Sequence, residues 1–314
     1  MDSRVHLVGR TLIWASDEVL PDGQRRGQIL EHDLATGTTR RLYTAAARNA
    51  VQNVRASANW LVWYEFGARS SAVDTRLYAM PRAGGAPLLI DDARTHGQFV
   101  LPADMTLAGD DVYWTVPEVL DGVWRGRLLR QRLPSGPQEV IATAPPGAVI
   151  AWPSASRSAV VYELFSKDAP FTSVAGDNTP GYDLAVLVPP VSQPSLGDGF
   201  LAFKLGERFK VGRVGIAVGA RAHELGPGEH PEAQGRIVTW AANTSTDSEI
   251  RVAFADRPSC VLTVTRNRDL RGTHEFLPSL GEGRLLWVVR DTRRPVGDQD
   301  RIRVAPVAPG LCVG

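Results

Sequence analysis

The sequence is poor in cysteine and has no long apolar run. Cys260 and Cys312 are its two cysteines in 314 residues, too few for a disulfide framework and wrongly spaced for a zinc site. We expect both to be buried thiols, although they would be able to pair in an exported protein. No apolar stretch approaches the roughly 20 residues of a membrane-spanning helix, and the first residues lack the pattern of a signal peptide.

The sequence also lacks an excess of charge of either sign. The 35 basic residues nearly balance the 34 acidic ones, and only three of the basic residues are lysine. A balanced charge provides no field that would attract nucleic acid or an anionic membrane, so neither is an expected partner. The motifs of serine hydrolases, zinc proteases and phosphate-binding loops are missing as well. The sequence therefore identifies no catalytic residue.

A short apolar segment that ends in a large aromatic residue recurs along the whole chain. Successive aromatic ends are 37 to 51 residues apart, a period that is typical of propellers and other repeat arrays. In each repeat the segment occupies the second of up to four short strand-like runs. We expect these aromatic residues to fill the space between blades; they are Trp14, Trp63, Trp114, Tyr162, Phe203, Trp240 and Trp287.

The repeats predict an all-β fold, a single seven-bladed β-propeller of mostly four-stranded antiparallel blades. The approximate blades are residues 1–46, 47–93, 94–146, 147–191, 192–228, 229–268 and 269–314. A six-bladed propeller is the alternative, with the fourth and fifth repeats sharing one blade. The third strand of the fourth repeat is expected at residues 182–188, and its outer strand is expected to be absent.

Three segments resemble TolB-type, WD40-like propeller repeats. Residues 28–43 (QILEHDLATGTTRRLY) are similar to the third-to-fourth-strand part of that repeat, and residues 194–199 (PSLGDG) and 278–283 (PSLGEG) resemble its inner-strand turn. The resemblance implies a bacterial propeller that binds proteins, peptides or sugars, or that accompanies an enzyme domain. It favours a periplasmic or secreted location over a cytoplasmic one, and it carries no catalytic residue with it.

The loops between the second and third strands are expected to be much longer than the other turns. They cover residues 16–27, 67–74, 117–126, 165–181 and 290–300. Long loops on a rigid scaffold usually hold binding sites. We therefore expect any site on this rim of the propeller, at or near the mouth of its channel.

Three histidines precede first strands, at the expected connections between blades: His96, His230 and His274. One hypothesis is a metal or proton-transfer site at the channel mouth, with Glu229 or Glu275 nearby. The alternative is that the three side chains bond neighbouring backbone at a repeated structural position, and that no cofactor is bound.

Trp124 and Arg125 lie in the expected loop 117–126, where no strand pattern buries them. An exposed Trp beside an Arg suits stacking on a sugar or contact with a protein. We therefore expect a non-catalytic propeller that recognises a protein, peptide or glycan, as a monomer or within a larger assembly. The alternative is a hydrolase or lyase whose site is lined by His96, His230 and His274, with or without a divalent metal.

Overall fold

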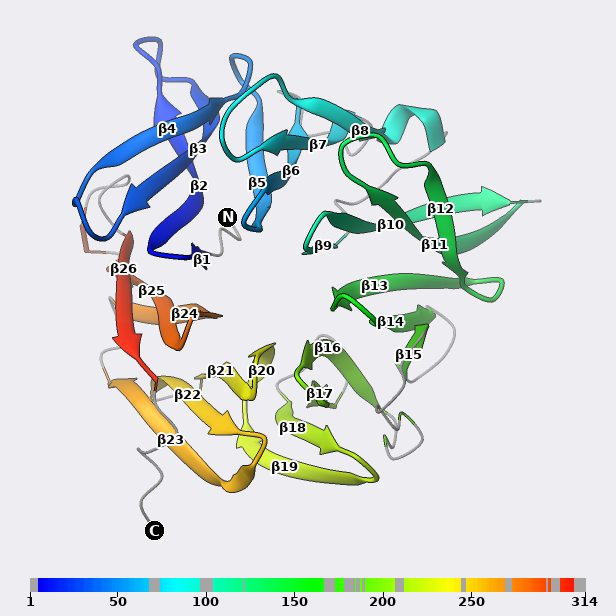
Figure 1. The fold of residues 1–314 in the computed structure, drawn as a ribbon, viewed down its shortest axis with the longest axis vertical. Coiled ribbons are helices and arrows are strands. Elements are labelled where there is room, and N and C mark those ends of the chain that lie inside the picture. The colour runs from blue at the N-terminus through cyan, green and yellow to red at the C-terminus, as the bar shows by residue number, and fades with distance from the viewer. Residues whose placement is uncertain are drawn as a thin grey trace. The chain divides into compact units, whose positions relative to one another are not determined.

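Antiparallel strands make up almost all of the regular structure. The computed structural model describes residues 5–67, 74–96, 104–120, 122–166, 173–177, 184, 187, 190–206, 212–243, 247–268, 273–291, 293–294 and 300–307. Consecutive strands pair in seven sheets, five of four strands and two of three within this described part. The chain is therefore a seven-bladed β-propeller (Figure 1), and the propeller scaffold implied by the resemblance to TolB-type, WD40-like repeats is confirmed.

The chain divides into two compact units, and each is described by itself. The first unit comprises residues 1–157 and 164–168 and holds three four-stranded blades. Its strands are β1 (His6–Val8), β2 (Thr11–Val19), β3 (Arg25–Asp33), β4 (Thr39–Thr44), β5 (Ala50–Ala56), β6 (Trp60–Phe66), β7 (Thr75–Pro81), β8 (Leu88–Asp92), β9 (Met105–Ala108), β10 (Asp111–Leu120), β11 (Val123–Arg132) and β12 (Gln138–Thr143). A short 3-10 helix, η2 (Ala93–His96), follows β8.

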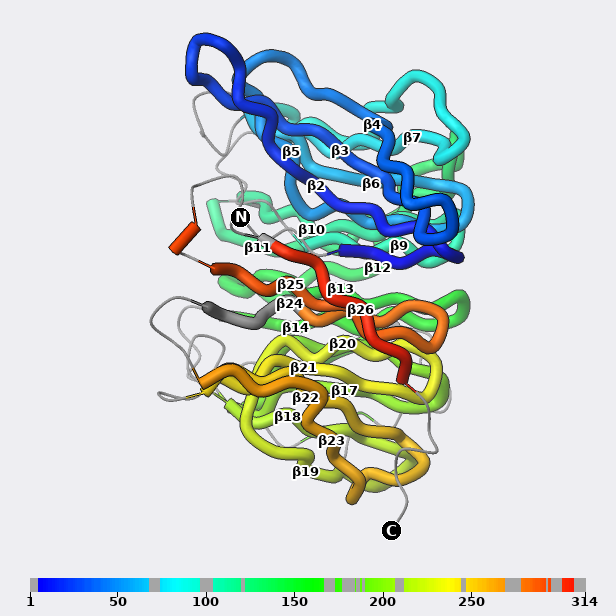
Figure 2. Tube along the Cα trace, turned by 90° about the vertical axis from the view of Figure 1, so that its left-hand side faces the viewer, coloured from blue at the N-terminus to red at the C-terminus, as the bar shows by residue number. Residues whose placement is uncertain are grey.

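The second unit comprises residues 158–163 and 169–314. Its blades consist of β16 (Val191–Gly197), β17 (Phe200–Leu205), β18 (Arg213–Val218), β19 (Arg221–Pro227), β20 (Glu229–Gln234), β21 (Ile237–Asn243), β22 (Ser248–Phe254), β23 (Arg257–Asn267), β24 (Thr273–Gly281), β25 (Arg284–Asp291) and β26 (Asp300–Pro306). The sheet of β13 (Ala148–Ala155), β14 (Val160–Ser166) and β15 (Ser173–Asp177) has residues in both units. Viewed from the side, the strands of neighbouring blades within each unit run in similar directions (Figure 2).

The recurring aromatic residues lie in the core, as the sequence predicts. Six of the seven are at most 9% exposed, and only Trp14 is half-buried. Five share an apolar cluster with a residue of the preceding blade; the pairs are Trp63 with Ile13, Trp114 with Val62, Phe203 with Val161, Trp240 with Phe200 and Trp287 with Ile250. Large rings at this position therefore fill the space between neighbouring blades.

The first strand of several blades contains a bulge with a left-handed residue. One extra residue interrupts the pairing of β5, β16, β20 and β24 with their second strands. Within these bulges Asn53, Gln193 and His230 have φ angles of 51°, 51° and 54°. Pro194 and Pro231 follow directly, and a bulge accepts proline because the ladder is already broken there.

Side chains of the preceding blade accept hydrogen bonds from the backbone N–H groups of left-handed residues in the first strands. His230 N donates to Gln193 Oε1 at 2.8 Å, and Gln193 N donates to Glu163 Oε2 at 3.1 Å. In the first unit Trp152 N, whose φ is 48°, donates to Asp104 Oδ2 at 3.0 Å. The bulge is therefore a repeated joint between blades rather than an isolated irregularity.

Two glycines allow the third strand of one blade to touch the first strand of the next. A Cβ atom on Gly27 would lie 2.2 Å from Val51 N, and one on Gly126 would lie 2.3 Å from Ile150 N. Gly27 N also donates to Asn49 O at 2.6 Å. Only glycine leaves room for this backbone contact.

Two of the expected long loops are hairpins instead. β2 pairs with β3 from Thr11 to Val19, and β10 pairs with β11 from Asp111 to Leu120. The turn between β2 and β3 is residues 20–24. Both segments carry polar residues on both faces, and the sequence therefore predicted loops. The strands nevertheless stay paired beyond the apolar core, because their backbones hydrogen-bond to each other.

The fourth blade also differs from expectation in its third strand. β15 lies within the expected loop 165–181, whereas the strand expected at residues 182–188 falls mostly outside the described residues. The fifth blade has a complete fourth strand, β19, and the described part of the fourth blade has three strands.

Cys260 is bonded in a disulfide, so the expectation of a buried thiol is wrong for this residue. The other cysteine, Cys312, lies outside the described residues. The sequence did not reveal the bond because spacing along a chain says little about proximity in space. Among the described residues, no helix is long and apolar enough to cross a membrane.

The inter-blade aromatic residues should dominate stability. Trp240 is fully buried and its Nε1 donates to Pro227 O at 3.0 Å. We expect Trp240→Ala to lower the free energy of unfolding by about 3–5 kcal/mol, because it leaves a cavity between blades. Trp124→Ala, at a Trp that is 41% exposed, is the matched control and should cost less than about 1 kcal/mol. Denaturant titration of both variants measures this, and equal losses would contradict the assigned core role.

The bulge joint predicts a second effect on stability. Asp104→Ala removes the acceptor of Trp152 N and should cost about 1–2 kcal/mol, since a half-buried donor loses its partner. Asp104→Asn keeps an amide oxygen in the same place, so we expect a smaller loss. Chemical denaturation compares the two variants, and the joint would be unimportant if both retained wild-type stability.

Candidate functional site

A single turn of 3-10 helix sets the position of His96 in the first unit. Arg94 N donates to Asp92 Oδ1 at 3.1 Å, and Thr95 Oγ1 donates to the Asp92 carbonyl at 2.7 Å. These bonds turn the chain immediately after β8 ends. His96 therefore lies at a connection between blades, where the sequence places it.

His96 lies between two carboxylates. Its Nε2 is 2.8 Å from Asp91 Oδ1, and its Nδ1 is 3.5 Å from Glu118 Oε1. Trp114 Nε1 donates to the other oxygen of Asp91 at 2.7 Å, and Arg127 donates to Glu118. The His96 side chain is 14% exposed and both carboxylates are less so. Because Asp91 accepts only, a hydrogen bond between them requires the proton on Nε2.

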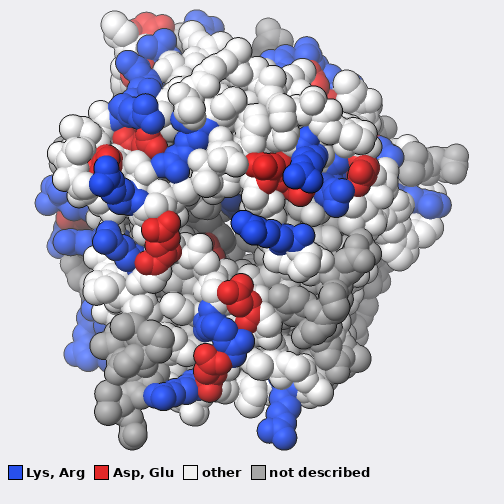
Figure 3. Space-filling view, in the orientation of Figure 1, with Lys and Arg blue, Asp and Glu red and all other residues white. Residues whose placement is uncertain are grey.

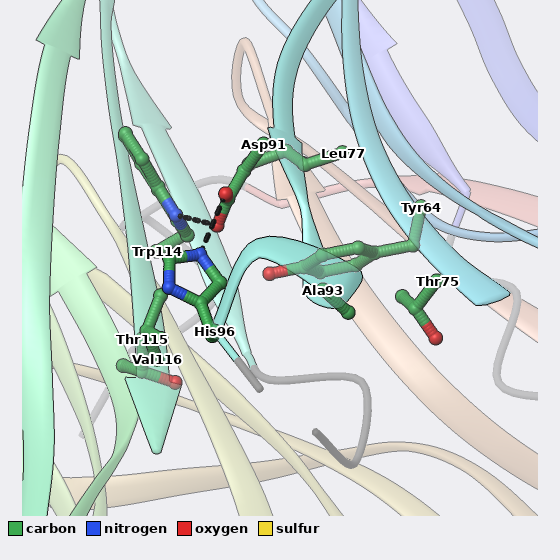
Figure 4. A pocket seen from close by; sticks show the side chains of 9 residues that line it. All are labelled: Tyr64, Thr75, Leu77, Asp91, Ala93, His96, Trp114, Thr115 and Val116. Atoms are coloured by element: carbon green, nitrogen blue, oxygen red, sulfur yellow. Dashed lines mark hydrogen bonds and ion pairs between the residues drawn. The ribbon is translucent and has the colours of Figure 1, made fainter. Parts of the chain in front are cut away.

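A small pocket lies beside this cluster (Figure 4). The bonds from Trp114 and His96 converge on the Asp91 carboxylate, and the Tyr64 hydroxyl points across the pocket toward the His96 ring. The pocket is lined by Tyr64, Thr75, Leu77, Asp91, Ala93, His96, Trp114, Thr115 and Val116. All nine residues belong to the second and third blades of the first unit or to η2.

Trp124 and Arg125 lie near the tip of the β10–β11 hairpin and not in a loop. Trp124 pairs with Val119 and Arg125 pairs with Glu118, so the two side chains lie on opposite faces of the hairpin. Arg125 shares its face with Glu118. Within the described part of the chain, its side chain forms no hydrogen bond or ion pair. The structure therefore associates Arg125, and not Trp124, with the His96 cluster.

His230 does not lie at a connection between blades, as the sequence had suggested, but inside β20 at the bulge. Its backbone N–H donates a hydrogen bond to the Gln193 side chain, and its Nε2 is 3.9 Å from Glu229 Oε2. The same oxygen lies 3.7 Å from Nζ of Lys204, a lysine whose side chain is fully buried. His230 thus belongs to a joint between blades, because its left-handed backbone and Pro231 fit the bulge.

The described residues contain no single site formed by all three candidate histidines. His96 belongs to the first unit, and His230 and His274 to the second. His274 lies within β24, where its backbone pairs with Arg290, and not at a connection as expected; its side chain is outside the described part. Among the residues that the structure describes, no group of three or more His, Cys, Asp or Glu side chains could hold a metal ion.

The surface charges of the face in Figure 3 form small mixed groups. Lys and Arg side chains lie next to Asp and Glu side chains over the described part of this face. Ion pairs produce such mixing, for example Arg213 with Glu224 and Arg236 with Asp256. The described surface in this view therefore shows no extended field of one sign.

Sequence reasoning missed most partners of His96. Glu118 was placed in the expected loop 117–126, and neither Arg127 nor Asp91 was singled out. Trp114 was recognised as a packing residue, but its Nε1 also fixes the Asp91 carboxylate. Only the strand register, which sets Glu118 opposite Arg125 and Val116 opposite Arg127, brings these groups to one place.

The surroundings of Asp92 strongly favour the ionised form of its carboxyl group. Arg94 donates to its carboxylate and is the largest cause that lowers its pKa, to about 2; burial opposes this, and Arg94 N and the Arg76 side chain lower the pKa further. Arg76 Nε lies 3.2 Å from Asp92 Oδ2. These contacts link β7, β8 and η2 next to His96.

This carboxylate should make stability sensitive to acid. The folded pKa of Asp92 is about 2 and its ordinary value is 3.8. The stabilisation is therefore complete above about pH 4 and is lost as the pH falls toward 2. Asp92→Asn should flatten the decline in unfolding free energy over this range by about 1–2 kcal/mol, after allowance for the exposed Arg94. Denaturant titrations between pH 5 and pH 2 measure it, and parallel curves would contradict it.

Comparisons with known proteins identify similar folds. No protein-family model matches the chain, and no curated protein matches its sequence. The β-propeller domain of the Trilobed protease from Pyrococcus furiosus is 10% identical with a TM-score of 0.65, over 97% of this chain and 95% of that one. The polysaccharide lyase Uly1 is 8% identical with a TM-score of 0.62, over 97% and 90%.

A third similar structure comes from a study of two prolyl endopeptidases. It is 14% identical with a TM-score of 0.64, and the match covers 97% of this chain but 47% of the endopeptidase. This chain thus spans about half the length of that enzyme. The expectation of a non-catalytic binding propeller is wrong by these comparisons, because the similar propellers come from peptidases and a polysaccharide lyase. At such low identity the likeness itself shows the fold alone.

Proposed function

We propose that this chain is a lyase that cleaves an acidic polysaccharide, with His96 as its acid–base group. The carrying observation is the arrangement of His96 between Asp91 and Glu118, at 2.8 Å and 3.5 Å. A histidine whose one nitrogen is fixed by a carboxylate exchanges protons at the other nitrogen. Here that nitrogen is Nδ1, on the side of Glu118.

The chemistry of elimination suits such a group. A lyase removes the proton next to the carboxylate of a uronic acid, the electron pair forms a carbon–carbon double bond, and the glycosidic oxygen leaves with a proton. The step consumes no water and needs a base and an acid, but no nucleophile. His96 Nδ1 takes the proton and, as the imidazolium, donates it to the departing glycosidic oxygen, while the Glu118 carboxylate, which Arg127 holds in place, stabilises the imidazolium.

Arg125 supports an acidic substrate. It lies on the same face of the hairpin as Glu118, and among the described residues its side chain has no ion-pair partner. A guanidinium binds a carboxylate with two parallel hydrogen bonds. Neutralising the carboxylate of a uronic acid also makes the neighbouring C–H more acidic. Arg125 is therefore the expected substrate-binding residue.

The similarity to the polysaccharide lyase Uly1 supports this proposal, since the match covers nearly all of both chains. Peptide hydrolysis is the second candidate. It is favoured by the similar propellers of the Pyrococcus furiosus protease and the prolyl endopeptidase. The His96 pocket offers no serine or cysteine nucleophile among its lining residues, and for this reason the lyase is preferred.

We also propose that the protein works in an oxidising compartment, outside the cytoplasm. The disulfide at Cys260 supports this, because such bonds persist mainly in exported proteins.

The test is cleavage of a panel of uronic-acid polysaccharides, measured by the absorbance of the unsaturated product. We expect His96→Ala to reduce kcat by at least about 100-fold, because a positioned acid–base group contributes that much. Asp91→Asn should lower kcat as well, since the amide no longer fixes the His96 tautomer. Arg125→Gln should mainly raise KM.

His32→Ala is the matched control. His32 lies on β3 and its Nδ1 bonds Thr39 at the surface, so we expect unchanged activity. Wild-type protein that cleaves no polysaccharide but releases peptide fragments would replace the lyase by the second candidate. Activity that survives His96→Ala would remove His96 from the mechanism.

A further inference from the structure

The pocket beside His96 is lined by two buried hydroxyl groups that have no hydrogen-bond partner among the residues that the structure describes. They are the Tyr64 hydroxyl and Thr75 Oγ1, and these residues are 4% and 2% exposed. Buried polar groups nearly always bond protein or an ordered water. The Tyr64 hydroxyl, which faces the His96 ring (Figure 4), therefore points to a partner in the pocket.

The size of the pocket identifies that partner. About 10 Å³ of the pocket is open to the centre of a water molecule, which is the room that one water needs. The pocket therefore has room for one ordered water.

The orientation of Tyr64 and the free acceptor capacity of Asp91 allow a water to hydrogen-bond to both. The Tyr64 hydroxyl points toward the His96 ring and the Asp91 carboxylate (Figure 4). Asp91 Oδ1 accepts a hydrogen bond from His96, and Asp91 Oδ2 accepts one from Trp114. A carboxylate oxygen accepts more than one, so Asp91 has capacity for a further donor.

We propose that one ordered water in this pocket bridges the Tyr64 hydroxyl to Asp91, which makes Tyr64 a positioning residue for His96. The Tyr64 hydroxyl donates to the water, and the water donates to the carboxylate. The consequence for catalysis rests on the proposed function, whereas the water site does not.

The protonation state of Tyr64 agrees with this direction of donation. Burial raises the pKa of its hydroxyl well above the ordinary value, and the negative charges of Asp91 and Asp104 raise it further. The phenol therefore keeps its proton and donates it in a hydrogen bond. Through the water, the Tyr64 hydroxyl limits rotation of the Asp91 carboxylate. This carboxylate in turn fixes the orientation of the His96 ring.

A high-resolution crystal structure of the wild-type protein tests the water site. We expect a water within hydrogen-bond distance of both the Tyr64 hydroxyl and an Asp91 oxygen. Tyr64→Phe retains the ring and should lose this water. A dry pocket in the wild type would overturn the proposal, as would a water that stays in place in Tyr64→Phe.

Kinetics with the best uronic-acid polysaccharide test the positioning role. Tyr64→Phe should lower kcat about tenfold, displace the pH profile of kcat and leave KM unchanged, because Tyr64 touches no substrate. Tyr113→Phe is the matched control; Tyr113 is equally buried but does not line the pocket. An unchanged kcat and pH profile in Tyr64→Phe would overturn the positioning role. If the wild type shows no cleavage, the proposed function fails while the crystal structures still decide the water site.

Discussion

The bulge in the first strands is the constraint on which the joints between blades depend. An extra residue with a left-handed backbone turns its N–H away from its own sheet, and such a donor needs an acceptor elsewhere. The preceding blade supplies one, as Gln193 does for His230 and Asp104 does for Trp152. Neighbouring blades are thus held by directional bonds as well as by apolar packing, and a bulge without its acceptor would leave a buried donor unsatisfied at a cost of about 1–3 kcal/mol.

The candidate site uses the same kind of contact between blades. Trp114 belongs to the third blade and packs against the second, where it fills space with its ring and donates its Nε1 to Asp91. His96 comes from the connection between these two blades, and Glu118 continues the strand of Trp114. Packing and chemistry therefore share residues, which places a polar cluster in a nearly closed setting where electrostatic interactions are strong.

The architecture was predictable, and the site was largely not. The spacing of the aromatic residues predicted seven blades because each blade has a large ring at the same position of its second strand, where it packs between blades. The outer half of the β10–β11 hairpin, residues 117–126, was mistaken for a loop because it pairs without an apolar face. The partners of His96 depend on this register, so Glu118, 22 residues away in the chain, was not visible as its neighbour. His230 was misplaced because the sequence signal for a connection, a polar residue before Pro231, is also the signal for a bulge.

Among the three candidate histidines, His96 and His230 have described side chains with different surroundings, and this difference explains why His96 is the candidate for proton transfer. Glu229 beside His230 lies within 3.7 Å of the fully buried Lys204, so its charge already has a partner at a fixed place. His230 itself is defined by its backbone, whose N–H completes a joint. His96 makes its contacts through both ring nitrogens, each toward a carboxylate of a different strand. A ring held in this way gains or loses a proton without moving, and pre-organised geometry of this kind is what general acid–base catalysis requires.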